Sequence, residues 1–194
     1  YDNWECPPNG QGEIALMLLN IMSGVDKFGD DPLWVDRMHR EIEAGRIAYR
    51  DRNLYLADPE FSDVPVDQML SADYAAAIRA QIHPDKAYAD LPPTTLPPHK
   101  HTVYITVVDK DRNACSLINT VFHSFGAGLM TPQSGIVLQC RGQGFVVDPG
   151  HPNCIAPGKR PLHTIIPGMA TKDGKTVMSF GVMGGEYQAF GHMQ

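Results

Sequence analysis

The sequence predicts an α+β fold, with helices in the first half of the chain and antiparallel hairpins in the second. The first half holds segments with helical start and stop signals. The second half alternates β-branched runs with polar turns. Between the halves, residues 84–101 are poor in strand formers and contain Pro92, Pro93, Pro97 and Pro98. We therefore expect a helical layer and a sheet layer joined by this proline-rich segment.

Two helices of the first half have clear ends. Residues 13–22 are apolar on nearly every side and stop at Ser23-Gly24, so this helix should be buried. Ser71 is a good N-cap for a helix over residues 72–82, which has to end before Pro84.

A longer helix is expected between these two, running to about Asn53. Asp31 would be its N-cap, with Pro32 in the first turn. Within it, Asp51 and Arg52 are neighbours that can pair on the helix. The apolar residues of this helix lie roughly along one stripe, formed by Trp34, Met38, Ile42 and Tyr49.

Two hairpins follow the proline-rich segment. Their strands are residues 103–108, 114–121, 162–169 and 176–180. The first turn, residues 109–113, is polar, and the second, residues 171–175, contains the Asp-Gly signal of a tight turn. Gly184-Gly185 then precede a last helix.

The composition is that of one ordinary globular domain. The 194 residues are 43% hydrophobic and 20% charged. The net charge of −6 argues against nucleic acid or an anionic membrane surface as the partner. The longest apolar run, Ile14–Leu19, is too short for a transmembrane helix. We expect no nucleic-acid partner and no membrane partner.

Neither a metal nor a cofactor is expected. The four cysteines form no CxxC pair and have no histidine at zinc-like spacing. Cys115 lies in an apolar strand and should be a buried thiol, while disulfides among the other cysteines are left open. The group His83, His99 and His101 lacks the spacing of a metal site.

The ends of the sequence indicate a fragment of a longer precursor. Tyr1 is not preceded by methionine, a charged segment or a signal-like apolar segment. The last residues, 191–194, stop equally abruptly. The compartment therefore stays open, and both cytoplasmic and periplasmic locations are compatible with the sequence.

Thr102 stands at the sharpest change of character in the chain. It directly follows the proline-rich segment and precedes Val103–Val108, the strongest strand signal. A self-cleaving hydrolase makes its new N-terminus at such a position, where the freed α-amino group can act as base for the threonine hydroxyl. The alternative is a β-branched residue that simply begins an edge strand.

A series of motifs resembles the gamma-glutamyltranspeptidase family, in particular its acylase-like branch with the cephalosporin and glutaryl acylases. In chain order the motifs are Pro7-Pro8-Asn9-Gly10-Gln11-Gly12, Ala48-Tyr49-Arg50-Asp51-Arg52, Leu56-Ala57-Asp58-Pro59-Glu60-Phe61, Thr106-Val107-Val108-Asp109-Lys110, Gln133-Ser134-Gly135-Ile136, Lys159-Arg160-Pro161-Leu162 and Gly184-Gly185. Each motif is weak by itself, and their order around the proline-rich gap carries the resemblance.

The resemblance implies the αββα sandwich of N-terminal-nucleophile (Ntn) hydrolases. It implies that the precursor cleaves itself between His101 and Thr102. Residues 1–101 would then be the C-terminal part of a large subunit, and residues 102–194 the N-terminal part of a small subunit. The expected partners are these two subunits, which can also associate as a homodimer of the pair, and a small-molecule amide substrate with a γ-glutamyl or other carboxylate-bearing acyl group.

The resemblance also assigns catalytic roles. Thr102 falls on the nucleophile, and Thr120 on the threonine that hydrogen-bonds it, although Thr120 is equally well explained as a hairpin residue. Gly184 and Gly185 fall on the oxyanion hole, where two backbone N–H groups face the substrate carbonyl oxygen. The alternative for this glycine pair is a plain strand-to-helix turn.

The chain departs from the transpeptidases around the acyl group. The differences are Phe122 in place of asparagine, Arg141 and Gly144 in place of glutamine and aspartate, His163-Thr164 in place of two serines, and a shorter segment from Phe145 to Arg160 in place of the lid-bearing loop. The missing aspartate would hold the glutamyl ammonium, and a buried ammonium without a counter-charge is costly. Glutathione is therefore a doubtful substrate.

Arg141 adds a fixed positive charge instead. With His163 and Thr164 it can bind a substrate carboxylate, which points to an acyl group that bears an acid but no amine, such as glutaryl. A structural salt bridge is the alternative for Arg141, and a satisfied polar residue for His163.

Three functions compete at this point. The first is an Ntn amidohydrolase that forms an acyl-enzyme on Thr102 and passes it to water. The second is a true gamma-glutamyltransferase acting on glutathione-type donors. The third is an unprocessed, non-catalytic scaffold.

Overall fold

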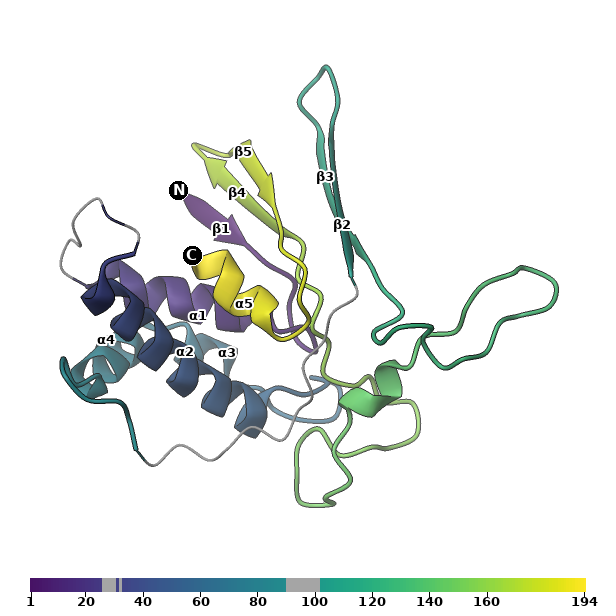
Figure 1. The fold of residues 1–194 in the computed structure, drawn as a ribbon, viewed down its shortest axis with the longest axis horizontal. Helices are drawn as coiled ribbons and strands as arrows, with labels where there is room; N and C mark the ends of the chain where they lie inside the picture. Colours follow the sequence, from purple (N-terminus) through teal and green to yellow (C-terminus); the bar gives the residue numbers. More distant parts are fainter. Residues whose placement is uncertain (26–30, 32, 90–101) are drawn as a thin grey trace.

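The computed structural model describes residues 1–25, 31, 33–89 and 102–194. Its helices lie to one side of the strands, and long irregular loops extend beyond the strands (Figure 1). The helices are α1 Gly12–Ser23, α2 Val35–Tyr55, α3 Val66–Met69, α4 Ala72–Gln81 and α5 Tyr187–Met193, with a 3₁₀ turn at Arg141–Gly144. The strands are β1 Asp2–Trp4, β2 Val103–Val108, β3 Ala114–Asn119, β4 Gly168–Lys172 and β5 Lys175–Phe180. The predicted α+β class is confirmed.

The strands form two antiparallel sheets. One is the β2–β3 hairpin, and the other has the order β1-β4-β5. The turn between β4 and β5 is Asp173-Gly174, with φ angles of 51° and 72°, as a tight hairpin turn requires. Both predicted hairpins are therefore confirmed. The edge strand β1 escaped prediction because three residues carry too little pattern.

The second hairpin starts later than the sequence predicts. Residues 162–167 do not belong to β4, which begins at Gly168. They lie beside the Asn9–Gln11 loop, where Gln11 N donates to His163 O (3.0 Å) and His163 N donates to Asn9 O (2.8 Å). Residues 162–167 therefore bond to the loop near the start of the chain instead of extending β4. A pattern of neighbouring residues cannot predict this long-range pairing.

The core is built around α1, as expected for a helix that is apolar on nearly every side. Ile14, Met17, Leu18 and Ile21 are fully buried. They pack in one cluster with side chains of α2, α4 and α5, including Ile47, Ile78 and Ala189. Burial of each large aliphatic side chain contributes about 1.5–3 kcal/mol. The predicted helix at 72–82 is also confirmed, and its cap Ser71 Oγ accepts from Tyr74 N at 3.1 Å.

The expectations for α2 were partly wrong. The helix begins at Val35 after Trp34, and Asp31 instead accepts from Leu33 N in a local turn (2.9 Å). Pro32 lies outside the described residues. Of the predicted apolar stripe, Trp34, Met38 and Ile42 are exposed. The face that packs inward carries small residues and buried polar groups, which a hydrophobic pattern does not reveal: Ala44, Gly45, Ile47, Ala48, Asp51 and Arg52.

Cys115 is exposed rather than buried, because β3 pairs only with β2 in the described part of the chain. All four cysteines are free.

Asp51 and Arg52 do not pair with each other. Asp51 contacts Arg50 and Tyr74, whereas Arg52 pairs with Glu186. Within the described ranges, no helix is long and apolar enough to cross a bilayer.

A buried carboxylate ties the helical half to the loop that precedes β4. Asp58 follows α2, is 1% exposed, and accepts from Arg160 N (2.8 Å), Nε (3.1 Å) and Nη2 (2.6 Å). These hydrogen bonds from Arg160 hold the pKa of Asp58 well below its usual range. The loop that leads to His163-Thr164 is thereby anchored on the helices.

The variant Arg160→Met should lower the melting temperature of the full-length protein by a few degrees at pH 7. Because the Asp58 pKa is lowered on folding, this stabilisation is full above the ordinary aspartate pKa of about 4 and is lost as the pH falls below it. Thermal unfolding between pH 7 and pH 3 should show the difference from wild type shrinking below about pH 4. Lys110→Met, at an exposed turn position, is the control. A difference that is the same at every pH would contradict this role of Asp58.

Candidate active site

Thr102 and Thr120 flank the open end of the β2–β3 hairpin. The last pair of the antiparallel register is Val103 with Asn119; Thr102 directly precedes the first of these residues and Thr120 directly follows the second. Thr102 is half-buried, and Thr120 Oγ1 accepts from Phe122 N at 2.9 Å in a tight turn. His101, on the other side of the predicted cleavage site, lies outside the described residues.

A glycine that sequence analysis missed brings β5 close to the start of β2. A Cβ atom at Gly181 would lie 2.6 Å from the ring of Tyr104, so a side chain there would collide with it. Tyr104 Oη also contacts Ser179 Oγ of β5 at 3.1 Å. Tyr104 is two residues after Thr102, and Gly181 is three residues before Gly184. The only signal in the sequence was a glycine directly after a strand.

Gly184 and Gly185 form the turn between β5 and α5. Their φ angles are 128° and 60°, values that favour glycine. The Gly184 carbonyl accepts from Tyr187 N, and the Gly185 carbonyl from Gln188 N, both at 3.2 Å. Because the N–H and C=O of a trans peptide point in opposite directions, the Gly185 N–H points away from the first turn of α5.

Arg141 is a buried cation without a carboxylate partner among the described residues. It is 3% exposed, its Nη1 donates to Thr164 Oγ1 at 2.9 Å, and its guanidinium carbon lies 3.8 Å from the centre of the Phe122 ring. Its Nε is buried and has no hydrogen-bond partner. Burial lowers its pKa to about 10, so it stays charged at pH 7. No salt bridge of Arg141, the alternative raised by the sequence, occurs among residues 1–25, 31, 33–89 and 102–194.

His163 lies next to this cation and is neutral at pH 7. Burial and the Arg141 charge lower its pKa to about 4. Its Nδ1 accepts from Ile165 N at 3.3 Å, which leaves the proton on Nε2. His163 can therefore donate a hydrogen bond to an anion, but it adds no charge.

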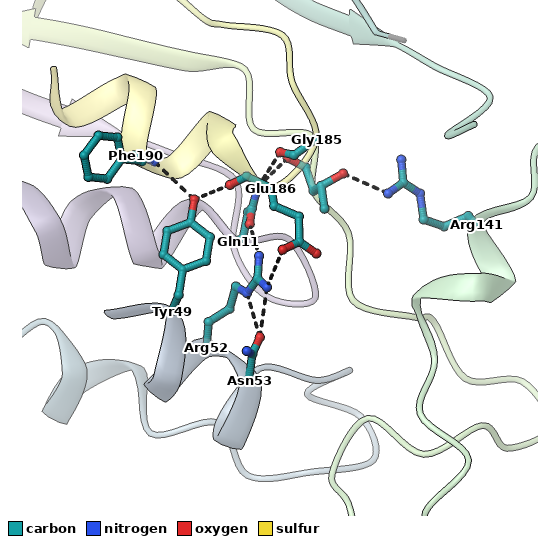
Figure 2. A network of polar contacts seen from close by, with 9 residues as sticks. Gln11, Tyr49, Arg52, Asn53, Arg141, Gly185, Glu186 and Phe190 are labelled. Carbon is teal, nitrogen blue, oxygen red and sulfur yellow. Dashed lines mark hydrogen bonds and ion pairs between the residues drawn. The ribbon is translucent and has the colours of Figure 1, made fainter. Parts of the chain in front are cut away.

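A polar network behind the glycine turn was also missed (Figure 2). Gln11 and Arg52 are fully buried, and Arg52 bonds both Gln11 Oε1 (2.9 Å) and Glu186 Oε2 (3.0 Å). Tyr49 Oη donates to the Glu186 carbonyl. Gln11 belongs to the motif Pro-Pro-Asn-Gly-Gln-Gly in the loop before α1, and Arg52 to the motif Ala-Tyr-Arg-Asp-Arg in α2. These two motifs were the available signal.

A series of contacts connects Thr120 with Gly185. In order they run through Thr120, Phe122, Arg141, Thr164, Gln11 and Gly185. No group of three or more metal-binding side chains occurs in the part of the chain that the structure describes. The arrangement combines a threonine at a strand start, a positive-φ glycine pair and a buried cation.

A sequence model described as "Gamma-glutamyltranspeptidase" matches residues 1–194, the whole chain. The chain belongs to the gamma-glutamyltranspeptidase family. The family inferred from the order of the motifs is thereby confirmed.

Individual relatives include the acylase-like branch. The chain is 35% identical to the glutathione hydrolase-like YwrD proenzyme of Bacillus subtilis, covering 97% of this chain and 35% of that protein. It is 35% identical to the oxamate amidohydrolase proenzyme of Klebsiella pneumoniae, covering 95% and 34%. The crystal structure of cephalosporin acylase from Bacillus halodurans superposes with a TM-score of 0.88 at 43% identity, covering 99% of this chain and 34% of that one. The chain spans about a third of the length of these relatives.

We expect the imidazole of His163 to remain neutral from pH 8 down to about pH 5. The variant Arg141→Met should raise its pKa part of the way toward the ordinary value, because the positive neighbour is removed while burial remains. A pH titration of ¹³C-labelled histidine by NMR, assigned with His163→Gln, measures this. Arg37→Met, on α2, is the matched control. An unchanged pKa in Arg141→Met would contradict the electrostatic coupling.

Proposed function

We propose that this chain forms part of an Ntn amidohydrolase that cleaves itself between His101 and Thr102 and then hydrolyses an amide through an acyl-enzyme on Thr102. The observation that carries the proposal is the position of Thr102, which directly precedes β2 at the open end of the hairpin, where Val103 pairs with Asn119. The family membership supports it, as do relatives that are named proenzymes.

Self-cleavage would begin with attack of Thr102 Oγ on the carbonyl carbon of His101. The C–N bond between the two residues breaks, an ester to Thr102 Oγ forms, and the nitrogen becomes the free α-amino group of Thr102. Water then hydrolyses the ester, which leaves a carboxylate on His101 and restores the hydroxyl. A threonine hydroxyl is a weak nucleophile, so a base is required.

In the mature enzyme the α-amino group of Thr102 is that base, directly or through water. It takes the hydroxyl proton as Oγ attacks the substrate carbonyl, and the proton passes to the leaving amine. The N–H groups of Gly184 and Gly185 stabilise the oxyanion, where one donor contributes about 10²–10³-fold in rate. Water then attacks the acyl-enzyme and releases the acid.

The acyl group proposed for this site carries a carboxylate and no ammonium. Arg141 is a buried cation that donates a hydrogen bond to Thr164, and its Nε has no partner among the described residues. A carboxylate ligand would relieve the cost of that unpaired charge, and neutral His163 would donate one further hydrogen bond. An ammonium group near Arg141 would be repelled. The name of the oxamate amidohydrolase relative is consistent with an acid-bearing amide.

The variant Thr102→Ala should leave the full-length proenzyme uncut and without hydrolytic activity, because the nucleophile is lost. Thr102→Ser should still cleave, and Thr106→Ala, an exposed threonine on the same strand, should behave as wild type. Intact mass spectrometry resolves the products. Cleavage of Thr102→Ala before residue 102 would refute the proposal, and a wild-type chain that stays uncut would favour the scaffold.

Arg141 should separate substrates by charge. Glutaryl-4-nitroanilide should be hydrolysed with a higher kcat/KM than γ-glutamyl-4-nitroanilide. Arg141→Met should lower kcat/KM for the glutaryl substrate by about 10²-fold, since a buried charge-assisted hydrogen bond is worth about 1.5–3 kcal/mol. Butyryl-4-nitroanilide, which has no charge on its acyl group, is the control and should change little. Preference for the γ-glutamyl donor, with stimulation by glycylglycine, would favour the transferase instead.

A further inference from the structure

The turn that carries Gly184 and Gly185 is held by side chains from the other half of the chain. Gln11 precedes α1, whereas Tyr49 and Arg52 lie on α2. All three reach the turn through hydrogen bonds to its backbone or to the neighbouring Glu186 (Figure 2). The predicted cleavage at residue 101 would place them on a different polypeptide from the turn.

Gln11 uses both ends of its side-chain amide. Its Nε2 donates to the carbonyls of Gly185 (3.0 Å) and Thr164 (2.9 Å), and its Oε1 accepts from Arg52 Nη1 at 2.9 Å. The side chain is fully buried, so water cannot replace these contacts. A cation at the oxygen polarises the amide and strengthens its two N–H donors. One side chain thus fixes the glycine turn relative to the segment that supports Arg141.

The carbonyl groups on either side of Glu186 are held separately. Gly185 O takes the hydrogen bond from Gln11, and Glu186 O takes the one from Tyr49 Oη, which itself accepts from Phe190 N at 3.4 Å. Arg52 lies 4.6 Å from the centre of the Tyr49 ring and pairs with the Glu186 carboxylate, so it also orders Tyr49.

We infer that Gln11, Tyr49 and Arg52 are positioning residues that lock the peptide planes of the Gly184–Glu186 turn. Glycines with positive φ have wide conformational freedom, so the turn needs external donors to keep one geometry. The Gly185 N–H lies in the peptide before Gly185, whose carbonyl accepts from Tyr187 N. The peptide after Gly185 is held by Gln11 and Gln188 N, which limits how far the backbone can rotate about Gly185. The catalytic consequence rests on the proposed function, whereas the ordering of the turn does not.

Hydrogen exchange measured by mass spectrometry on the full-length protein tests the ordering directly. Gln11→Glu keeps the size of the side chain and the acceptor for Arg52, but loses both donors. The amides of Tyr187 and Gln188, whose acceptors are in the turn, should exchange about tenfold faster than in wild type, because loss of a hydrogen bond of about 1–1.5 kcal/mol raises local opening by that factor. Gln81→Glu, the same substitution at an exposed position of α4, should leave exchange unchanged.

Tyr49→Phe is the second variant and covers the case in which Gln11→Glu does not fold. It removes only the hydroxyl that bonds the Glu186 carbonyl, and should also speed exchange in residues 184–190. Unchanged exchange there, in the folded variants, would overturn the inference. Faster exchange spread over α1 and α4 as well would show a general loss of stability and would also overturn it.

Kinetics with glutaryl-4-nitroanilide then connect the ordering to catalysis. Gln11→Glu should lower kcat by about 10²-fold, the effect of a misplaced oxyanion donor, with KM within about threefold of wild type. An equal change in KM would assign Gln11 to substrate binding and contradict the positioning role. A wild-type protein that hydrolyses no amide refutes the proposed function, and the exchange result still decides the ordering of the turn.

Discussion

The buried amide of Gln11 is the point at which the two halves of this protein meet. Its three hydrogen bonds join the loop before α1, the α2 helix, the segment before β4 and the turn before α5. A fully buried amide cannot exchange these partners for water, so each segment has to sit where the amide places it. The β1–β4 pairing and the Asp58–Arg160 contact join the same two halves elsewhere. A chain cut at residue 101 would therefore keep its two parts interlocked.

Two buried guanidinium groups near this point have different surroundings. Arg52 is matched by Glu186, Gln11 and Asn53, and so contributes order. Arg141 has Thr164 and the face of Phe122, but no carboxylate among the described residues. A buried charge without a counter-charge is costly. Such a group is therefore a candidate for binding an anionic ligand. This contrast is the physical basis for treating Arg52 as structural support and Arg141 as a substrate contact.

Patterns over a few consecutive residues correctly predicted the helices and turns whose formation depends on residues close in the sequence. The apolar run at 13–22 became α1, Ser71 caps α4, and Asp173-Gly174 forms the predicted hairpin turn. The exposed stripe of α2 was predicted wrongly, because its buried face is made of small and polar residues. Cys115 was predicted buried, yet β3 lies in a hairpin of two strands. Both errors concern which face is covered, and that depends on partners far along the chain.

The sequence by itself determined the fold class and the family, and it named the candidate site residues. These follow from backbone preferences over a few residues and from the order of short motifs. Only the tertiary structure decided which side chains meet: Gln11 with Gly185, 174 residues apart, Arg141 with Thr164, and Gly181 against Tyr104. Such contacts form when packing of the helices and sheets brings distant segments of the chain together. A pattern of neighbouring residues carries no information about which distant segments meet.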